Sequence, residues 1–263
     1  MQDFIHILQY GIETPEAWGT FHVCAVAAVL ITTVLLSLIG RNAKDRTVRK
    51  ICVIFWILLV LFETYKQIVF SFNYNDGAPI WDYQWYAFPF QLCSAPLYVL
   101  PLVFLTDQDG FVHRSATAFL STYVLFAGAA VMVYPGDVFI DMLGIDIHTM
   151  FWHGSQVILG VFFLVRYRKE LSVRYFLSGV FLFLIMTGVA MALNILVPRY
   201  IDETFNMYYI SPLFPSTLPV LSSIWGKVPW PLFFAIYITG YTALALLVFL
   251  VSRALAKKQM KKA

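Results

Sequence analysis

Seven long runs of apolar residues, separated by short polar loops, dominate the pattern along this chain. The hydrocarbon core of a bilayer is about 30 Å thick, so one membrane-spanning helix needs about 20 apolar residues. The pattern therefore predicts an all-α membrane protein, a bundle of seven transmembrane helices that forms a single polytopic domain over residues 1–263. The predicted spans are 19–39, 51–72, 88–106, 115–134, 149–165, 175–197 and 230–252.

The segment 198–229, between the last two spans, differs from the other connections. It is long and only weakly polar, and it contains Pro198, Pro212, Pro215, Pro219 and Pro229. Irregular backbone near lipid has to be buried against protein or line a cavity, because lipid offers no hydrogen-bond partners. We expect an outer lid or a re-entrant element here, and an ordinary extracellular loop is the alternative.

Basic residues gather in alternate connections. Of the 18 lysines and arginines, 15 fall in the loops 40–50 and 166–174, in the C-terminal tail, or at Arg114. The connections on the other side carry most of the remaining acidic residues and only two basic ones, Arg199 and Lys227. Because cytoplasmic loops carry the excess of Lys and Arg, we predict a multi-pass protein of the cell membrane. Its N-terminus is expected outside and its C-terminus in the cytoplasm.

The composition narrows the class of protein further. Hydrophobic residues make up 60% of the 263 residues, charged residues only 13%, and the mean hydropathy is +0.74. A soluble domain carries about 25% charged residues, so a soluble globular enzyme, a disordered protein and a nucleic-acid binder are excluded. The three cysteines form no CxxC pair, and the motifs HExxH and GxSxG are absent. We expect no metal site, no organic cofactor and no obligate protein partner.

Polar side chains fall at a similar depth in several predicted spans. Consecutive spans run in opposite directions and a helix rises 1.5 Å per residue, so depths can be compared between spans. Ionisable groups inside a bilayer are costly and are candidates for function. We therefore expect one polar layer near the outer side of the membrane. It consists of His22, Glu63, Lys66, Cys93, His153 and Asn194.

Glu63 and Lys66 are three positions apart, so they share a face of one helix. Two interpretations remain open for this pair. It is either a buried ion pair that fixes helix packing or the polar wall of a substrate cavity. In the second interpretation Glu63 and Lys66 bind the substrate together with His22 and Asn206.

Cys93 lies in a short segment between two prolines, Pro89 and Pro96. Pro89 suits the first turn of a helix and Pro96 removes one backbone hydrogen bond, so Cys93 is predicted within about one and a half turns of a helix N-terminus. The helix dipole favours an anion there and hence a thiolate. Most membrane cysteines and histidines are inert packing residues, which is the alternative for Cys93 and His153.

A thiolate beside an imidazole is an arrangement that carries out nucleophilic acyl transfer. We predict Cys93 as the nucleophile and His153 as the general base. Gln156 shares a helix face with His153 and is expected to orient it, while Gln91 and Asn194 are candidates for stabilising an oxyanion. Weaker claims belong to the histidines in loops or at span ends, His6, His113 and His148.

The run Phe88-Pro-Phe-Gln-Leu-Cys93 resembles the LPLHLC signature of the YwaF / transmembrane protein 164 family, nearer to its bacterial YwaF-type branch. The segments 151–154 (Phe-Trp-His-Gly) and 206–212 (Asn-Met-Tyr-Tyr-Ile-Ser-Pro) fit the same family, and the likeness covers about residues 15–255. It implies a membrane acyltransferase that moves a fatty acyl group between phospholipids with an essential Cys and His. These fall on Cys93 and His153, whereas Gln91 replaces the histidine usual at its position in the family.

Residues and resemblance together predict an intramembrane acyltransferase or transacylase that acts on membrane phospholipids through a Cys93 thioester. Two alternatives stay open. A lipid or solute transporter or scramblase would use the same polar layer as an outward-facing cavity, without covalent chemistry. A lipid hydrolase would release the acyl group to water instead of to a second lipid.

Overall fold

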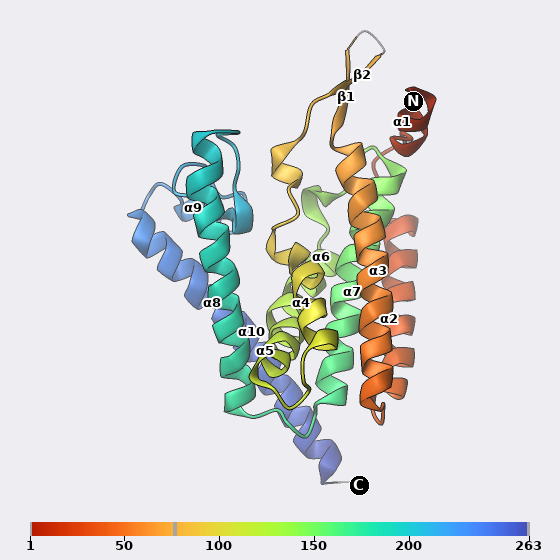
Figure 1. Ribbon diagram of the computed structural model, residues 1–263, viewed down its shortest axis with the longest axis vertical. Helices are drawn as coiled ribbons and strands as arrows, with labels where there is room; N and C mark the ends of the chain where they lie inside the picture. The colour runs from red at the N-terminus through yellow and green to blue at the C-terminus, as the bar shows by residue number, and fades with distance from the viewer. Residues whose placement is uncertain (1, 76–77, 262–263) are drawn as a thin grey trace.

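The computed structural model describes residues 2–75 and 78–261, and most of its regular structure is helical (Figure 1). The helices are α1 (Gln2–Leu8), α2 (Thr20–Gly40), α3 (Asp45–Val69), α4 (Ala95–Leu105), α5 (Phe111–Phe119), α6 (Leu125–Val133), α7 (Leu143–Arg166), α8 (Val173–Leu196), α9 (Leu221–Ile224) and α10 (Trp230–Met260). Short helical turns are η1 (Trp85–Ala87), η2 (Leu92–Ser94), η3 (Leu120–Val124), η4 (Gly136–Val138), η5 (Val197–Arg199) and η6 (Met207–Tyr209). Strands β1 (Phe72–Asn75) and β2 (Ala78–Trp81) form an antiparallel hairpin in which Phe72 pairs with Trp81.

Within the described residues, six helices are long and apolar enough to cross a membrane. One of them is continuous from α5 to α6, because the π-helical turn η3 joins the two. The six correspond to six of the seven predicted spans, and the chain is a multi-pass membrane protein. They cover 20–40, 45–69, 111–133, 143–166, 173–199 and 230–260.

The remaining predicted span, 88–106, is shorter than expected. The apolar helix covers Leu92–Leu105, and its α-helical part, α4, begins only at Ala95. The backbone of Gln91 is extended, and the 3-10 turn η2 leads from there into α4. Pro96 occupies the first turn, where a missing N–H costs no hydrogen bond. Cys93 is thus next to a helix N-terminus but precedes the α-helix, which corrects the predicted placement.

Helix α7 is the central helix of the bundle. In its most apolar stretch 72% of the residues are buried, compared with 6% in α2. It packs against α2, α3 and α6, while α8 packs against α5. Figure 1 shows α8 and α10 on the opposite side of the molecule from α2 and α3. A side chain on α7 is therefore held by protein, whereas most of α2 presents apolar residues to its surroundings.

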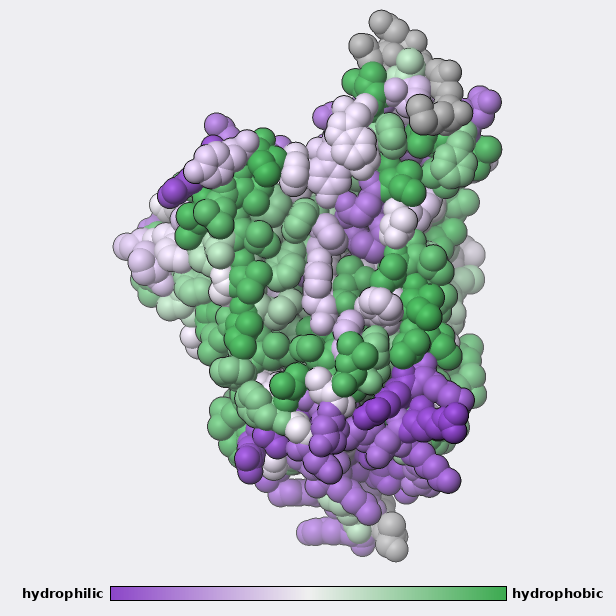
Figure 2. Space-filling view, viewed as in Figure 1, coloured by the Kyte–Doolittle hydropathy of each residue, from purple (hydrophilic) through white to green (hydrophobic). Residues whose placement is uncertain are grey.

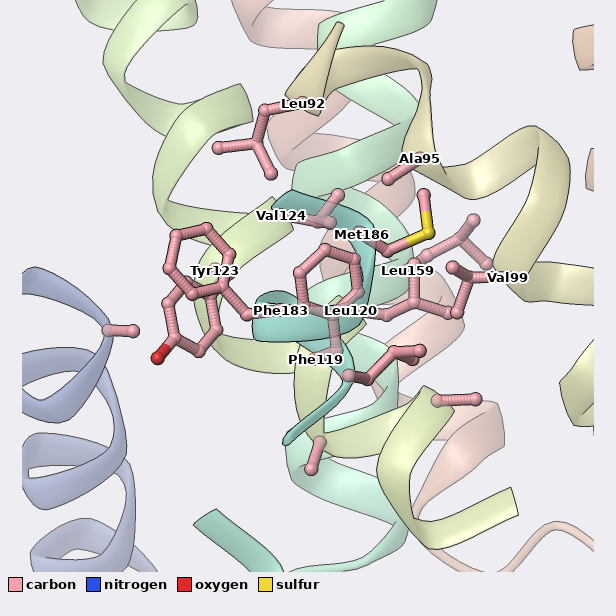
Figure 3. Packing of buried hydrophobic residues seen from close by; sticks show 14 of the residues in the cluster. Leu92, Ala95, Val99, Phe119, Leu120, Tyr123, Val124, Leu159, Phe183 and Met186 are labelled. Atoms are coloured by element: carbon pink, nitrogen blue, oxygen red, sulfur yellow. The ribbon is translucent and has the colours of Figure 1, made fainter. Parts of the chain in front are cut away.

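The apolar core lies where α5, η3, α7 and α8 meet. Tyr123 of η3 stacks on Phe183 of α8 with ring centroids 4.3 Å apart, and both side chains are fully buried. Figure 3 shows Phe119 and Leu120 beside these rings, with Leu159 of α7 near them. This packing fixes the middle of the helices on which the candidate site is built.

The two ends of the molecule differ in polarity. Figure 1 shows the N-terminus, the β1–β2 hairpin and α9 towards one end, which we call the N-terminal end. The C-terminus and the α2–α3 and α7–α8 connections lie at the opposite, C-terminal end. Figure 2 shows a hydrophilic cap at the C-terminal end below a broad hydrophobic band. The bundle therefore has the surface of a membrane protein with its basic loops collected on one side.

The segment 198–229 lies at the N-terminal end and is mostly irregular. Part of it is packed into the protein, since Phe205, Met207, Tyr208 and Ile210 are buried. Tyr208 and Tyr209 both have left-handed backbone, with φ of 59° and 58°. Such a conformation costs on the order of 1–3 kcal/mol for each non-glycine residue, so contacts from elsewhere have to stabilise this turn.

Candidate functional site

The backbone of Cys93 is bound by α7. Its carbonyl oxygen accepts a hydrogen bond from Trp152 Nε1 and another from Gln156 Nε2, each of 2.8 Å. Trp152 and Gln156 are four positions apart, so they lie on one face of α7. An unpaired carbonyl is costly in an apolar environment. The late start of α4 thus leaves a carbonyl that α7 satisfies twice, and the half-buried Cys93 is fixed against that helix.

His153 lies on the same stretch of α7, between the two residues that bind Cys93. Its Nδ1 is 2.9 Å from the carbonyl oxygen of Thr149. A carbonyl only accepts, so Nδ1 carries the proton and Nε2 of the neutral ring has a free lone pair. Among the described residues no hydrogen bond reaches Nε2. The side chain is 8% exposed, and it is therefore a buried base with one unoccupied nitrogen.

The predicted role of Gln156 is wrong in its detail. Its amide nitrogen binds Cys93 and not the imidazole, and the Thr149 carbonyl orients His153 instead. The amide oxygen of Gln156 has no partner among the described residues. Gln156 therefore joins the two candidate catalytic residues by holding the segment of one to the helix of the other.

Helix α6 supports this part of α7 through a glycine. A Cβ added to Gly128 would lie 2.6 Å from Gln156 Cβ and 2.8 Å from the backbone oxygen of His153. Both distances are shorter than real Cβ contacts. The absence of a side chain at Gly128 therefore lets α6 approach α7 at the level of the candidate base.

Glu63 and Lys66 form the predicted ion pair. Lys66 Nζ is 2.8 Å from Glu63 Oε1, and Gln67 Nε2 donates to the same oxygen at 2.6 Å. Glu63 is buried, and its charged group and that of Lys66 lie close enough to Cys93 to act on the thiol. The structure thus brings Glu63 and Lys66 to the surroundings of Cys93, as expected for the polar layer.

His148 is the residue that sequence reasoning missed. Its Nε2 is 3.8 Å from Glu63 Oε2, and its ring stacks on Trp152, which binds Cys93. The sequence placed His148 at a span end, and its distance of four positions from Trp152 is the one signal that puts both on the same face of α7. Its neighbour Glu63 is on another helix and could not be identified from spacing.

Gln67 connects the Glu63 cluster to the chain that leads to Cys93. Its Nε2 also donates to the carbonyl of Ala87 at 2.9 Å, and its Oε1 accepts from Tyr83 Oη at 2.7 Å. Burial, with smaller contributions from the charges of Glu63 and Tyr98, raises the pKa of Tyr83 to about 12. The phenol therefore stays protonated at neutral pH and remains the donor in this bond.

Gln91 and Asn194 hold a backbone turn. Gln91 Nε2 donates to the carbonyl of Asn206 at 2.9 Å, and its Oε1 accepts from Tyr208 N at 2.7 Å. Asn194 exchanges two hydrogen bonds with the backbone of Met207, of 2.8 and 2.6 Å. We call residues 206–210 the clamped turn. These bonds stabilise its left-handed residues, and they engage the amides that were expected to stabilise an oxyanion.

Asn206 and His22 also serve the backbone. Asn206 Nδ2 donates to Pro215 O at 3.0 Å and its Oδ1 accepts from Ser211 N at 2.9 Å. His22 accepts from Trp18 N at 2.9 Å and donates to Met132 O at 3.0 Å, which joins the start of α2 to the end of α6. Both ring nitrogens of His22 are thus used away from Cys93, and the structure does not bring it to the other candidates.

Two open grooves lie near the N-terminal end. The first, of about 480 Å³, runs along α3 past Glu63 and Gln67 and reaches Leu97 of α4. Figure 2 shows some hydrophilic surface near this end of α3, surrounded by hydrophobic surface. The second, of about 530 Å³, is lined by aromatic residues and two aspartates and shares Trp81 with the first. The first groove is shaped for an apolar chain with a polar group at its side.

In the part of the chain that the structure describes, no group of three or more His, Cys, Asp or Glu side chains is placed to hold a metal ion. The groups that are available for chemistry are a thiol, two buried imidazoles and a carboxylate. A thiol near a base with a free lone pair can act as a nucleophile towards an ester or thioester. The arrangement therefore suits acyl chemistry carried out by side chains.

Comparisons with known proteins yield one match. No curated protein and no solved structure matches this chain. The sequence model of the TMEM164 family matches residues 17–252, which is most of the chain and includes every candidate residue named above. The protein therefore belongs to the TMEM164 family.

Proposed function

We propose that this protein is an intramembrane acyltransferase that moves a fatty acyl group from one phospholipid to another through a thioester on Cys93. One observation carries the proposal. Trp152 and Gln156, which lie on either side of His153 in α7, both bind the backbone of Cys93. A nucleophile and a base that are 60 positions apart in the sequence are thereby held to one another's elements.

In the first half of the reaction, His153 Nε2 takes the proton of the Cys93 thiol. The sulfur attacks the ester carbonyl of a donor phospholipid, and the C–S bond forms as the ester C–O bond breaks. His153 gives the proton to the departing glycerol oxygen, which leaves as a lysolipid hydroxyl. The acyl group remains on Cys93 as a thioester.

In the second half, the hydroxyl of an acceptor lysolipid attacks the thioester carbonyl. His153 takes the hydroxyl proton, the new C–O bond forms and the C–S bond breaks. The proton then passes from His153 to the sulfur, which restores the free thiol. Gln91 and Asn194 enter the proposal as supports of the clamped turn, since their amides already bind its backbone.

We propose a seven-pass topology in the cell membrane, with α4 and its lead-in as the short third span. The C-terminal end carries the basic loops and is assigned to the cytoplasm. This orientation directs the grooves and the Glu63 cluster towards the extracytoplasmic leaflet. It is supported by the opposite positions of the two termini and by the hydrophilic cap at the C-terminal end (Figures 1 and 2).

The test is to trap the thioester. The full chain, reconstituted in vesicles, is incubated with phosphatidylethanolamine, phosphatidylglycerol and phosphatidylcholine that carry the same radiolabelled acyl chain. We expect a label on the protein that hydroxylamine removes and that is lost completely in Cys93→Ala. Cys52→Ala is the matched control, because Cys52 is buried in α3, and it should keep the label.

Equal labelling of the wild type and Cys93→Ala would refute the proposal. Product analysis with added lysolipid separates the remaining classes of function. Radiolabelled phospholipid is the product of a transferase, and free fatty acid is the product of a hydrolase. Movement of lipid across the vesicle membrane that persists in Cys93→Ala, without any labelled product, indicates a transporter or scramblase.

A further inference from the structure

Two buried polar atoms next to the site lack hydrogen bonds. They are Glu63 Oε2 and His148 Nε2, which have no partner in the described part of the chain. The two atoms are 3.8 Å apart, and both side chains are only 8% exposed. A hydrogen bond between N and O normally spans 2.7–3.2 Å. A buried polar atom without a partner is costly, so this pair needs an explanation.

Neither side chain is simply misplaced, because each has its own support. Glu63 is held through its other oxygen, Oε1, by Lys66 and Gln67. The His148 ring is stacked on Trp152, with centroids 4.9 Å apart and planes 21° apart. Trp152 is fixed in turn by its hydrogen bond to Cys93. The separation between Oε2 and Nε2 is therefore set by contacts on both sides of it.

The two atoms are complementary to a hydroxyl group. A hydroxyl both donates and accepts a hydrogen bond. Glu63 Oε2 is an acceptor, and His148 Nε2 is a donor in the tautomer that carries its proton there. An oxygen about 2.8 Å from each atom satisfies both. A carboxylate ligand would be repelled by Glu63, and an ammonium group would find no acceptor on a protonated Nε2.

The surroundings indicate where the hydroxyl comes from. Glu63 and Gln67 line the first groove, whose other residues include Val60, Ile68 and Leu97. Both orphan atoms are shielded from solvent, so a ligand approaches from the groove and not from bulk water. The groove fits an apolar chain, and its polar end leads through His148 and Trp152 to Cys93.

We propose that Glu63 and His148 bind the free glycerol hydroxyl of the lysophospholipid that accepts the acyl group, with the apolar chain of this lipid in the first groove. The inference rests on the proposed acyl transfer and names the acceptor site of that reaction. It makes His148 and Glu63 binding residues for the second half of the reaction, separate from His153.

The experiment measures the two halves separately. Reconstituted full-length protein is first labelled from the radiolabelled phospholipid mixture, without acceptor, and the label on Cys93 is quantified. Lysophospholipids with the same headgroups are then added, and the loss of label to new phospholipid is followed. In His148→Gln and in Glu63→Gln we expect labelling within twofold of the wild type, transfer at least tenfold slower, and a raised KM for the lysolipid.

Thr64→Ala is the matched control. Thr64 lines the same groove, but its hydroxyl bonds to the carbonyl of Val60 within its own helix. This variant should show wild-type rates for both halves. Glu63→Asp keeps the carboxylate and should recover part of the transfer rate that Glu63→Gln loses. A purely structural role for Glu63 would reduce labelling and transfer together.

A second measurement uses the wild-type protein alone, so that poor folding of a variant cannot decide the outcome. An acceptor analogue with hydrogen in place of the free hydroxyl is tested as a competitor of lysolipid. We expect it to compete at least tenfold less well than a non-reactive analogue that keeps a hydroxyl. Equal competition, or unchanged transfer in His148→Gln, overturns this inference while the thioester stands. Absence of label on wild-type Cys93 overturns the proposed function itself.

Discussion

The regions around His113 and His153 treat a buried histidine in opposite ways. Near the C-terminal end, His113 Nδ1 donates to Val103 O at 3.0 Å and its Nε2 accepts from Tyr167 Oη at 2.7 Å. Near Cys93, the ring of His153 is bound through Nδ1 alone. Both rings are buried, so burial does not separate them. The difference teaches that a fully bonded imidazole joins helices, whereas one with an open nitrogen is available for proton transfer.

The largest effect is expected from His153→Gln. An amide has no basic nitrogen, so acyl transfer should fall by about 10²–10⁴-fold, the usual contribution of a general base. The thermal unfolding temperature should change little, since only the bond to the Thr149 carbonyl is affected. The rate of label transfer and the unfolding temperature, measured on the same preparation, check this. A rate within a few-fold of the wild type would break the comparison between the two histidines.

Gly128→Ala is expected to have an intermediate effect on both properties. The added methyl group meets Gln156 and the His153 backbone at less than 3 Å, so α6 or α7 has to shift. Overpacking of this kind costs about 1–3 kcal/mol, and the displaced α7 should also slow transfer. Thermal unfolding and the transfer rate measure the two losses. Gly188→Ala is the control, because nothing lies within 4 Å of a Cβ there, and it should be neutral.

The smallest effect is expected from His113→Leu, and it concerns stability alone. The change leaves the Val103 carbonyl and the Tyr167 hydroxyl without partners, which costs about 1 kcal/mol. Transfer per folded molecule should equal that of the wild type. A lower unfolding temperature at an unchanged rate sharpens the comparison. A large loss of rate would show that His113 belongs to the chemistry after all.

Hydropathy predicted most of the fold, because a lipid-facing helix must be apolar over its whole length. Six of the predicted spans are long apolar helices. The remaining one failed at its start, where an apolar run was interpreted as helix although Pro89 and Pro96 restrict the backbone on either side of Cys93. Composition records how apolar a segment is, whereas the point at which α4 begins depends on backbone geometry.

The site was predicted less completely, because depth along a helix does not specify direction around it. Comparison of depths placed Glu63, Lys66, Cys93 and His153 in one layer, and the structure gathers them on neighbouring elements. The same reasoning included His22, whose ring faces Met132 and Trp18 instead. It passed over His148, whose partner Glu63 is supplied by another helix.

Gln91 and Asn194 show a further limit. An amide in an apolar span is equally compatible with binding a transition state and with binding backbone. Only the fold reveals the left-handed Tyr208 and Tyr209, which need such support. The clamped turn therefore explains two polar residues that the sequence assigned to chemistry.

The short α4 has a consequence for the membrane itself. Its 11 residues extend about 16 Å at 1.5 Å per residue, roughly half of a hydrocarbon core of about 30 Å. In the proposed orientation the reactive sulfur is mounted on a ruler that starts at the cytoplasmic surface. A lipid ester has to sink to that height, or the leaflet has to thin around the protein. Bilayer thickness thereby becomes a variable of the reaction, and the same polypeptide would work at different speeds in thin and thick membranes.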